Sequence, residues 1–329
     1  MSQIKTIRKI LIIGIGVIFL ILLFLKQQPV TKPINKTDPT PTQFQSNLLP
    51  YQKSPNQISW GINDIKIDPT LTVYKVLGEA NTTEIGNKMS QNLGFNNSKL
   101  DNSSLTVFEN ETDKSTLEIN KTENKISYYK NLLLNPIPIV SQKLEVEQIK
   151  NIFLKLVNQN LNLSGLNISI NNVEYEEIIN PRFVSSSKEN SQIVKINAYY
   201  AIKNYPILTD KGFPIVARFS WDGTLIKLDV DLLSSIIAKQ DDYPTFNFDE
   251  IKALPINNFK IINIDGGAQY DLTNFEDKAP EEVNINQTYI AYLDVDNYPL
   301  LRPYLICLGK GILDTGPATI TLAVPLLKE

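Results

Sequence analysis

Residues 213–230 read FPIVARFSWDGTLIKLDV and carry the clearest β-hairpin pattern in the chain. Trp221-Asp222-Gly223-Thr224 supplies the turn, because glycine accepts the positive φ that a tight hairpin requires. Apolar residues recur on both sides of this turn, which predicts strands at Phe213–Trp221 and Thr224–Val230. The hairpin therefore indicates an antiparallel sheet in this part of the chain.

The residues upstream of the hairpin predict a helix followed by further strands. Leu144–Val157 repeats apolar side chains at helical spacing and is the clearest helix expected after the N-terminal segment. Strands are expected at Leu166–Glu176 and Ile193–Ile202. Residues 141–240 are therefore predicted to form one helix with an antiparallel meander.

The same order of elements is expected twice more. An amphipathic helix that begins near Thr82, with strands around it, predicts a first unit at residues 60–140. A short helix at Phe248–Leu254, followed by strands, predicts a third unit at residues 241–329. The expected fold class is α+β: an N-terminal transmembrane helix, then repeated helix-plus-antiparallel-meander units. A nucleotide-binding doubly wound fold is not expected, because no Gly-rich strand-to-helix fingerprint occurs.

The middle unit resembles a PepSY-type repeat. The resemblance is carried by the helix Leu144–Val157, by Tyr205-Pro206-Ile207 and by the Asp222-Gly223 hairpin. It implies a helix paired with a small antiparallel sheet. A single N-terminal anchor with such units outside the membrane is similar to the YycH/YycI-type membrane proteins, which modulate a cell-wall sensor kinase. The resemblance implies no catalytic or binding residue.

The N-terminal segment predicts a membrane anchor. Ile10–Leu25 reads ILIIGIGVIFLILLFL and contains no charge. A helix of this length spans about 24 Å, against about 30 Å for the hydrocarbon core, and flanking basic side chains can snorkel to the interfaces. A cleaved signal peptide is the alternative, but Lys26-Gln27-Gln28-Pro29 lacks the small residues of a cleavage site. Residues 1–27 are therefore predicted to be an uncleaved anchor.

The predicted localisation follows from the residues around this anchor. Basic residues before Ile10 favour a cytoplasmic N-terminus. Six prolines at residues 28–59 predict an extended, solvated linker, because proline removes a donor and restricts the backbone. The expected arrangement is a single pass through the cell membrane, with the bulk of the chain extracytoplasmic.

The composition excludes several kinds of chemistry. The 329 residues include no histidine and one cysteine, Cys307, which removes Ser-His-Asp triads, His-ligated metals and thiolate zinc sites. Cys307 is interpreted as a small buried hydrophobe, and pairing between chains is the alternative. The first 27 residues hold four basic side chains and no acidic one, so the net charge of −3 becomes −7 over residues 28–329. This balance disfavours nucleic acid.

Paired carboxylates are the class of catalytic group that this composition excludes least. The candidate pairs are Glu176/Glu177, Asp229/Asp231, Asp241/Asp242 and Asp294/Asp296. Residues two apart on a strand share one face, and a glycosidase needs two carboxyl groups about 5–10 Å apart. The favoured interpretation is that these acids are solvated turn residues. Asp294-Val295-Asp296-Asn297 also suggests calcium, although the Gly and Glu of an EF-hand loop are missing.

Tyrosines on the expected strands form the last group of candidates. They are Tyr128/Tyr129, Tyr199/Tyr200, Tyr289/Tyr292 and Tyr298/Tyr304. Stacking on a sugar or a peptide is one role, and core or cross-strand packing is the favoured one. Asn-x-Ser/Thr triplets are also frequent, but an Asn-rich chain produces them by chance, so glycosylation is not predicted.

The sequence thus predicts a membrane-anchored, extracytoplasmic, non-enzymatic protein that acts through protein–protein contacts as a regulator or envelope scaffold. No catalytic, cofactor or metal residue is assigned, and no cofactor is expected. The expected partners are the membrane, through Ile10–Leu25, and an envelope or membrane protein. The alternative is an envelope carbohydrate-binding protein or carboxylate-based glycosidase. A deep cleft with two carboxylates favours that alternative, and flat sheet faces favour protein contacts.

Overall fold

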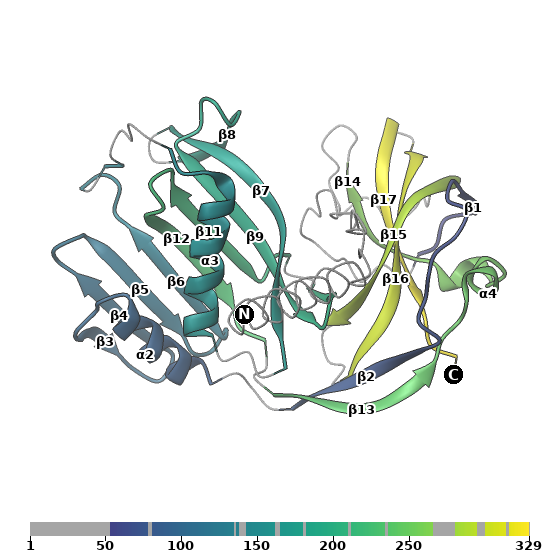
Figure 1. The fold of residues 1–329 in the computed structure, drawn as a ribbon, viewed down its shortest axis with the longest axis horizontal. Coiled ribbons are helices and arrows are strands. Elements are labelled where there is room, and N and C mark those ends of the chain that lie inside the picture. Colours follow the sequence, from purple (N-terminus) through teal and green to yellow (C-terminus); the bar gives the residue numbers. More distant parts are fainter. Residues whose placement is uncertain are drawn as a thin grey trace, which may run out of the picture. The chain divides into compact units, whose positions relative to one another are not determined.

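The computed structural model describes residues 53–77, 81–134, 136–137, 143–161, 165–179, 182–209, 212–233, 236–265, 280–294, 300–313 and 316–328. Within them the chain is about 56% strand and 15% helix, with three α-helices. Figure 1 shows the strands and helices of these residues.

The predicted fold class is wrong. The described residues are mostly β-sheet and do not form a series of helix-plus-meander units behind a transmembrane helix. The failure is clearest in the expected third unit, where α4 (Phe248–Lys252) has five residues and is followed by the 3-10 helix η1 (Ile256–Asn258). The later strands at residues 282–294 and 300–313 are long and pair with strands at residues 57–60 and 70–77, so they form a β-rich body instead.

Nine of the ten strands in the described residues of 81–233 follow one another in one antiparallel sheet, and we call this part the nine-stranded body. The strand order is β3-β4-β5-β6-β12-β11-β9-β7-β8. The strands are β3 (Ser98–Asp101), β4 (Leu105–Asn110), β5 (Ser115–Asn120), β6 (Lys125–Lys130), β7 (Asn167–Ile179), β8 (Arg182–Ser185), β9 (Ile193–Ile202), β11 (Ile215–Ser220) and β12 (Leu225–Asp231).

Two helices cover one face of this sheet (Figure 1). They are α2 (Thr82–Asn92) and α3 (Val146–Asn160), and α3 lies close to the range predicted from apolar spacing. Ile149, Phe153 and Val157 recur at four-residue spacing and are fully buried in the core between the helices and the sheet. Burial of this apolar stripe holds α3 on the sheet, since packing stabilises helices more than propensity does.

The predicted hairpin is confirmed as the turn between β11 and β12. Gly223 has a φ of 83°, and its N–H donates to Ser220 O at 2.9 Å. A Cβ at this position would lie 2.7 Å from Ile152 Cδ1 of α3. Glycine is therefore required twice here, by the backbone angle and by the close approach of the helix.

The remaining strands form a second part, which we call the long-strand body. Its strands are β1 (Gln57–Trp60), β2 (Thr70–Leu77), β13 (Ile236–Pro244), β14 (Lys260–Asp265), β15 (Glu282–Asp294), β16 (Leu300–Leu313) and β17 (Gly316–Pro325). One sheet has the order β1-β15-β16-β17-β14, with β1 parallel to β15. The strand β2 pairs with β13 and with the first residues of β16.

The nine-stranded body is an insertion between β2 and β13. Leu77 and Ile236 are direct partners in the antiparallel pair of these strands, so the chain leaves and re-enters the long-strand body side by side. One short strand, β10 (Tyr205–Thr209), pairs both with β9 and with β15. Local sequence patterns carry no information on such distant pairings, which is why they were not predicted.

The predicted membrane span and membrane localisation are also corrected. No helix in the described part of the chain is long and apolar enough to cross a bilayer. The longest of these helices, α3, has fifteen residues and buries one stripe while charged residues such as Glu147 and Lys155 face outward. Ile10–Leu25, on which that prediction rested, lies outside the described residues.

Candidate interaction surface

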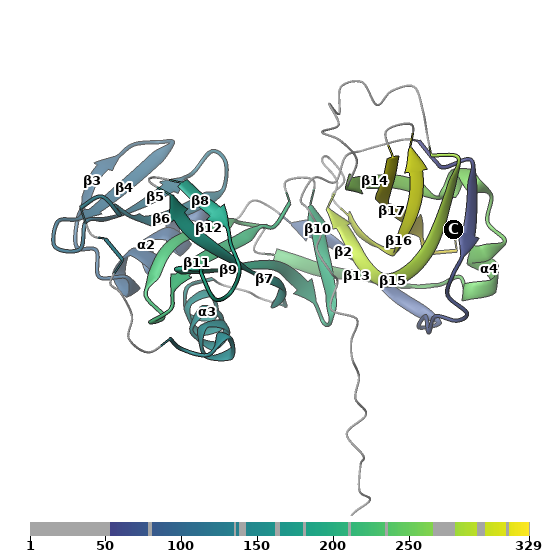
Figure 2. The same cartoon turned by 90° about the horizontal axis from the view of Figure 1, so that it is seen from above.

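The face of the nine-stranded sheet opposite α2 and α3 carries polar and charged side chains. Figure 2 shows the side of the sheet on which α3 lies. We call the face that carries these polar side chains the open face, because no helix of the described residues packs on it. Six of its residues are partners from strand to strand across the middle of the sheet: Glu118, Ser127, Asp229, Val216, Asn197 and Asn172. They face away from the core because successive residues of a strand point to opposite sides.

The neighbouring row of the open face contains three cations in direct register. Lys227 is opposite Arg218, and Arg218 is opposite Lys195. Like charges placed directly opposite one another are destabilising, and nearby carboxylates offset this repulsion. Lys227 Nζ lies 3.0 Å from Asp229 Oδ2, and Lys195 Nζ lies 2.8 Å from Glu174 Oε2.

The third cation forms the most buried ion pair of the open face. Arg218 Nε and Nη2 donate to the two carboxylate oxygens of Glu176 at 2.7 and 3.1 Å. The Glu176 side chain is 9% exposed, and the Arg218 guanidinium also lies 4.8 Å from the Phe183 ring centre. This bidentate pair ties β7 and β8 to β11, so its role is structural.

The structure separates the predicted pair Glu176/Glu177. Adjacent strand residues point to opposite faces, and Glu177 is the partner of Val184 on the face away from Arg218. The spacing of two places Asp229 and Asp231 on one face, but different groups bind them: Ser127 Oγ donates to Asp229 at 2.9 Å, and Lys125 lies 4.0 Å from Asp231. Neither pair forms an acid–base couple.

The two remaining acidic pairs lie in the long-strand body. Asp242 is bound by Lys239 at 2.6 Å and by the Thr72 hydroxyl, and these contacts hold the pKa of Asp242 below its usual value. Asp241 is exposed. Asp294 ends β15, while Asp296 and the rest of the suggested calcium loop lie outside the described residues. No group of three or more Cys, Asp or Glu that would suit a metal ion occurs within the described part of the chain.

The single thiol and most described tyrosines belong to the core. Cys307 is fully buried among apolar side chains, and this burial raises the pKa of its thiol, so the protonated form persists. Burial likewise raises the pKa of Tyr128 to about 12. Tyr129 differs, because it lies on the open face with its hydroxyl 3.2 Å from Glu118 Oε1. Tyr298 lies outside the described residues.

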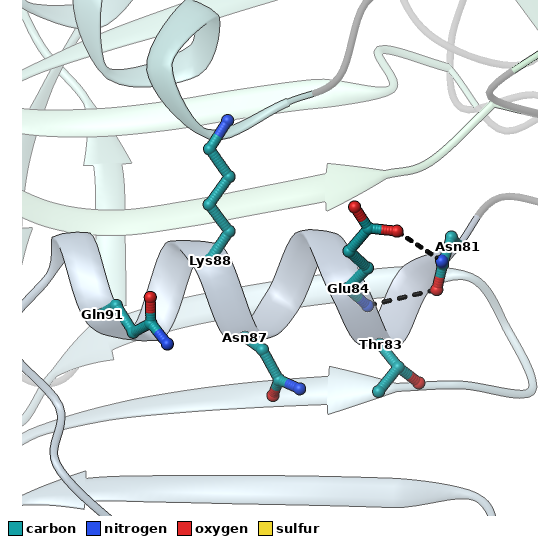
Figure 3. A pocket seen from close by; sticks show the side chains of 6 residues that line it. All are labelled: Asn81, Thr83, Glu84, Asn87, Lys88 and Gln91. Atoms are coloured by element: carbon teal, nitrogen blue, oxygen red, sulfur yellow. Dashed lines mark hydrogen bonds between the residues drawn. The ribbon is translucent and has the colours of Figure 1, made fainter.

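A shallow depression lies along the exposed side of α2 (Figure 3). Its lining residues are Asn81, Thr83, Glu84, Asn87, Lys88 and Gln91. Asn81 Oδ1 accepts the Glu84 N–H at 3.2 Å, and Asn81 Nδ2 donates to the Glu84 carboxylate at 2.6 Å. These bonds cap the helix, so the fold accounts for the polar groups of Asn81 and Glu84.

Exposed aliphatic side chains lie at one end of the nine-stranded sheet, in two places that β12, β11 and β9 separate. Because neighbouring strands are antiparallel, β6 and β7 run in the same direction, and their C-terminal residues lie at the same end of the sheet. Leu133 and Leu134 follow β6 and are 70% and 66% exposed, while Ile179 ends β7 and is 56% exposed. Val184 lies next to this hairpin tip. We call Leu133, Leu134, Ile179 and Val184 the apolar end.

The two leucines are held in place by their own turn. Asn131 Oδ1 accepts the N–H groups of Leu133 at 3.1 Å and of Leu134 at 3.3 Å. The turn therefore presents two aliphatic side chains to solvent on a defined backbone. Sequence reasoning missed this feature, although Leu132-Leu133-Leu134 in a connection between a strand and a helix was a usable signal, since connections are usually polar.

No protein-family model matches this sequence, and no curated protein matches it. The PepSY-type and YycH/YycI-type resemblance therefore stays a prediction.

Proposed function

We propose that this protein is a non-enzymatic binding module that acts through protein–protein contacts, as a regulator or scaffold, and that the apolar end is its contact surface. The observation that carries the proposal is the exposure of Leu133 and Leu134 on a hydrogen-bonded turn. Exposed aliphatic groups with a polar surround are typical of protein interfaces, where a few anchors supply most of the binding energy.

The charges near the apolar end favour a protein over an anionic surface. Arg182, Lys130 and Lys143 lie at this end of the sheet, but so do Asp113 and Asp222. Lys130 is within 3.9 Å of Asp113, so this cation is partly neutralised. A surface that recruits anionic lipid or nucleic acid needs a clear excess of basic residues, and this edge is mixed.

The described residues provide no observation that favours the glycosidase alternative. It needs two carboxyl groups that face one another across a cleft, with one pKa raised. The candidates Glu176 and Asp229 are instead bound by Arg218 and Lys227 on a sheet face. Protein contacts are therefore the better supported proposal.

Site-specific cross-linking in intact cells tests this function. A photoreactive residue at Leu134 is compared with one at Ile312, which is 76% exposed in the long-strand body. We expect a partner to be captured from position 134 and not from position 312. The purified partner should then bind at least about ten times more weakly to Leu134→Ser, and equally to Ile312→Ser. Equal capture at both positions, or none at position 134, contradicts the proposal.

A further inference from the structure

The strand β10 belongs to both bodies of the molecule. Tyr205 and Pro206 pair with β9, and the next three residues, Ile207 to Thr209, pair in parallel with Tyr292 to Asp294 of β15. The polypeptide crossings between the bodies, next to Leu77 and Ile236, lie side by side. The two crossings are adjacent, so by themselves they join the bodies along a single line. The strand β10 adds another contact between the bodies, away from β2 and β13.

Neighbouring side chains of β10 enter different cores. Ile207 is fully buried in the core of the nine-stranded body, in the same cluster as Tyr292 of β15. Leu208 is 1% exposed and packs with Ala291 and Leu293 on a face of the long-strand sheet. Most other core residues of the two bodies fall in separate clusters, although Tyr292 and Leu301 join the first cluster and Tyr199 joins the packing on the long-strand sheet. Because β10 packs in both cores, loss of its packing weakens the dependence of one body's stability on the other.

We propose that β10 is a clasp that couples the two bodies into one cooperative unit. Without it, the nine-stranded body and the long-strand body unfold in separate transitions, because each retains its own hydrophobic cluster. The proposal concerns the conformational behaviour of the chain and does not depend on the proposed function.

The chain has two tryptophans, and each body holds one. Trp60 packs edge-on against Phe248 in the long-strand body, with ring centres 5.1 Å apart. Trp221 is stacked on Tyr175 in the nine-stranded body at 5.9 Å, and its Nε1 donates to Ser191 O at 2.9 Å. The variants Trp221→Phe and Trp60→Phe therefore make fluorescence reporters of one body at a time.

Thermal unfolding of these two reporter proteins tests the clasp. Coincident transitions from different probes are the mark of a single cooperative unit, and we expect them in the parent chain. We expect Leu208→Ala to separate the Trp60 and Trp221 midpoints by roughly 5–10 °C. If Leu208→Ala fails to fold, Leu208→Val is used, with a smaller separation expected.

Leu117→Ala is the matched control, because Leu117 is equally buried but lies wholly within the nine-stranded body. It should lower both midpoints together. The clasp is refuted if both Leu208 variants shift the Trp60 and Trp221 midpoints by the same amount, or if Leu117→Ala shifts them as unequally as the Leu208 variant does.

Discussion

Two buried asparagines on neighbouring strands show how differently one residue type can be accommodated. Asn197 is fully buried, and its Nδ2 donates to Asn172 Oδ1 at 2.8 Å and to Glu174 Oε1 at 2.9 Å, while its Oδ1 has no hydrogen-bond partner within the described structure. Asn171 is 3% exposed at an irregularity of β7, and neither of its amide atoms has a hydrogen-bond partner within the described structure. A buried polar group without a hydrogen-bond partner lowers stability, whereas a buried donor that forms hydrogen bonds satisfies the groups that accept them.

Leucine at each position should therefore have opposite effects. We expect Asn171→Leu to raise the free energy of unfolding by about 1 kcal/mol, because it removes a buried amide without hydrogen bonds. Asn197→Leu should lower it by about 1–3 kcal/mol, because Asn172 and Glu174 lose a buried donor. Urea unfolding measures both variants. A loss of stability in both would contradict our account of Asn171.

The candidate site was partly predictable at this scale. The two-residue spacing of Asp229 and Asp231 was sufficient to place both on one face, since side chains alternate along any strand. Their partners were not predictable, because Ser127 and Lys125 come from β6, about a hundred residues away in the chain. The pairing of β6 with β12 decides which groups bind these acids, and this pairing is a property of the whole sheet.

At the scale of single elements, local sequence signals identified helices and turns reliably but did not predict the lengths of the elements. The spacing of apolar residues identified α3, and Gly223 identified the β11–β12 hairpin, because both signals act within a few residues. The helix expected at Phe248–Leu254 has only the five residues of α4, and Asn247 and Glu250 form a capping box at its start. The sequence that follows is strand-forming, and long-range pairing decided its structure.

The turn between β11 and β12 offers a test of how an element is positioned. Gly223→Ala places a Cβ at positive φ and 2.7 Å from Ile152 Cδ1. Gly94→Ala is the matched control, because Gly94 also has a positive φ, 80°, but no atom within 4 Å of the added Cβ. We expect about 1–2 kcal/mol of destabilisation for Gly94→Ala from the backbone alone.

Gly223→Ala should lower the free energy of unfolding further than Gly94→Ala does, because α3 must also shift away from the turn. Chemical denaturation of the two variants gives the difference directly. Equal losses would show that the contact between the turn and α3 relaxes without effect, and that the backbone angle alone requires glycine.

At the scale of the molecule, the insertion explains why prediction along the chain failed. The expected first unit, residues 60–140, supplies β2 to the long-strand body and β3 to β6 to the nine-stranded body. The long-strand body is therefore continuous in space but is built from two separate segments of the sequence. The part that is inserted, residues 81–233, is continuous in sequence and encloses most of one hydrophobic cluster.

A fragment of residues 81–233 should therefore fold by itself. Its termini lie close together, because the chain leaves and re-enters at the partners Leu77 and Ile236, and independent folding is expected of a body with its own core. We expect a cooperative thermal transition followed by Trp221 fluorescence, at a lower midpoint than in the full chain. The midpoint falls because Tyr292 and Leu301, which complete the same cluster, are absent.

The matched control is a fragment of residues 81–209, which lacks β11 and β12. These strands join β6 to β9, so their removal splits the sheet and exposes its apolar interior. This shorter fragment should show no cooperative transition by circular dichroism. Cooperative unfolding in both fragments would mean that β3 to β6 and β7 to β9 are separate folding units, and that the continuous nine-stranded sheet is not what stabilises the inserted part.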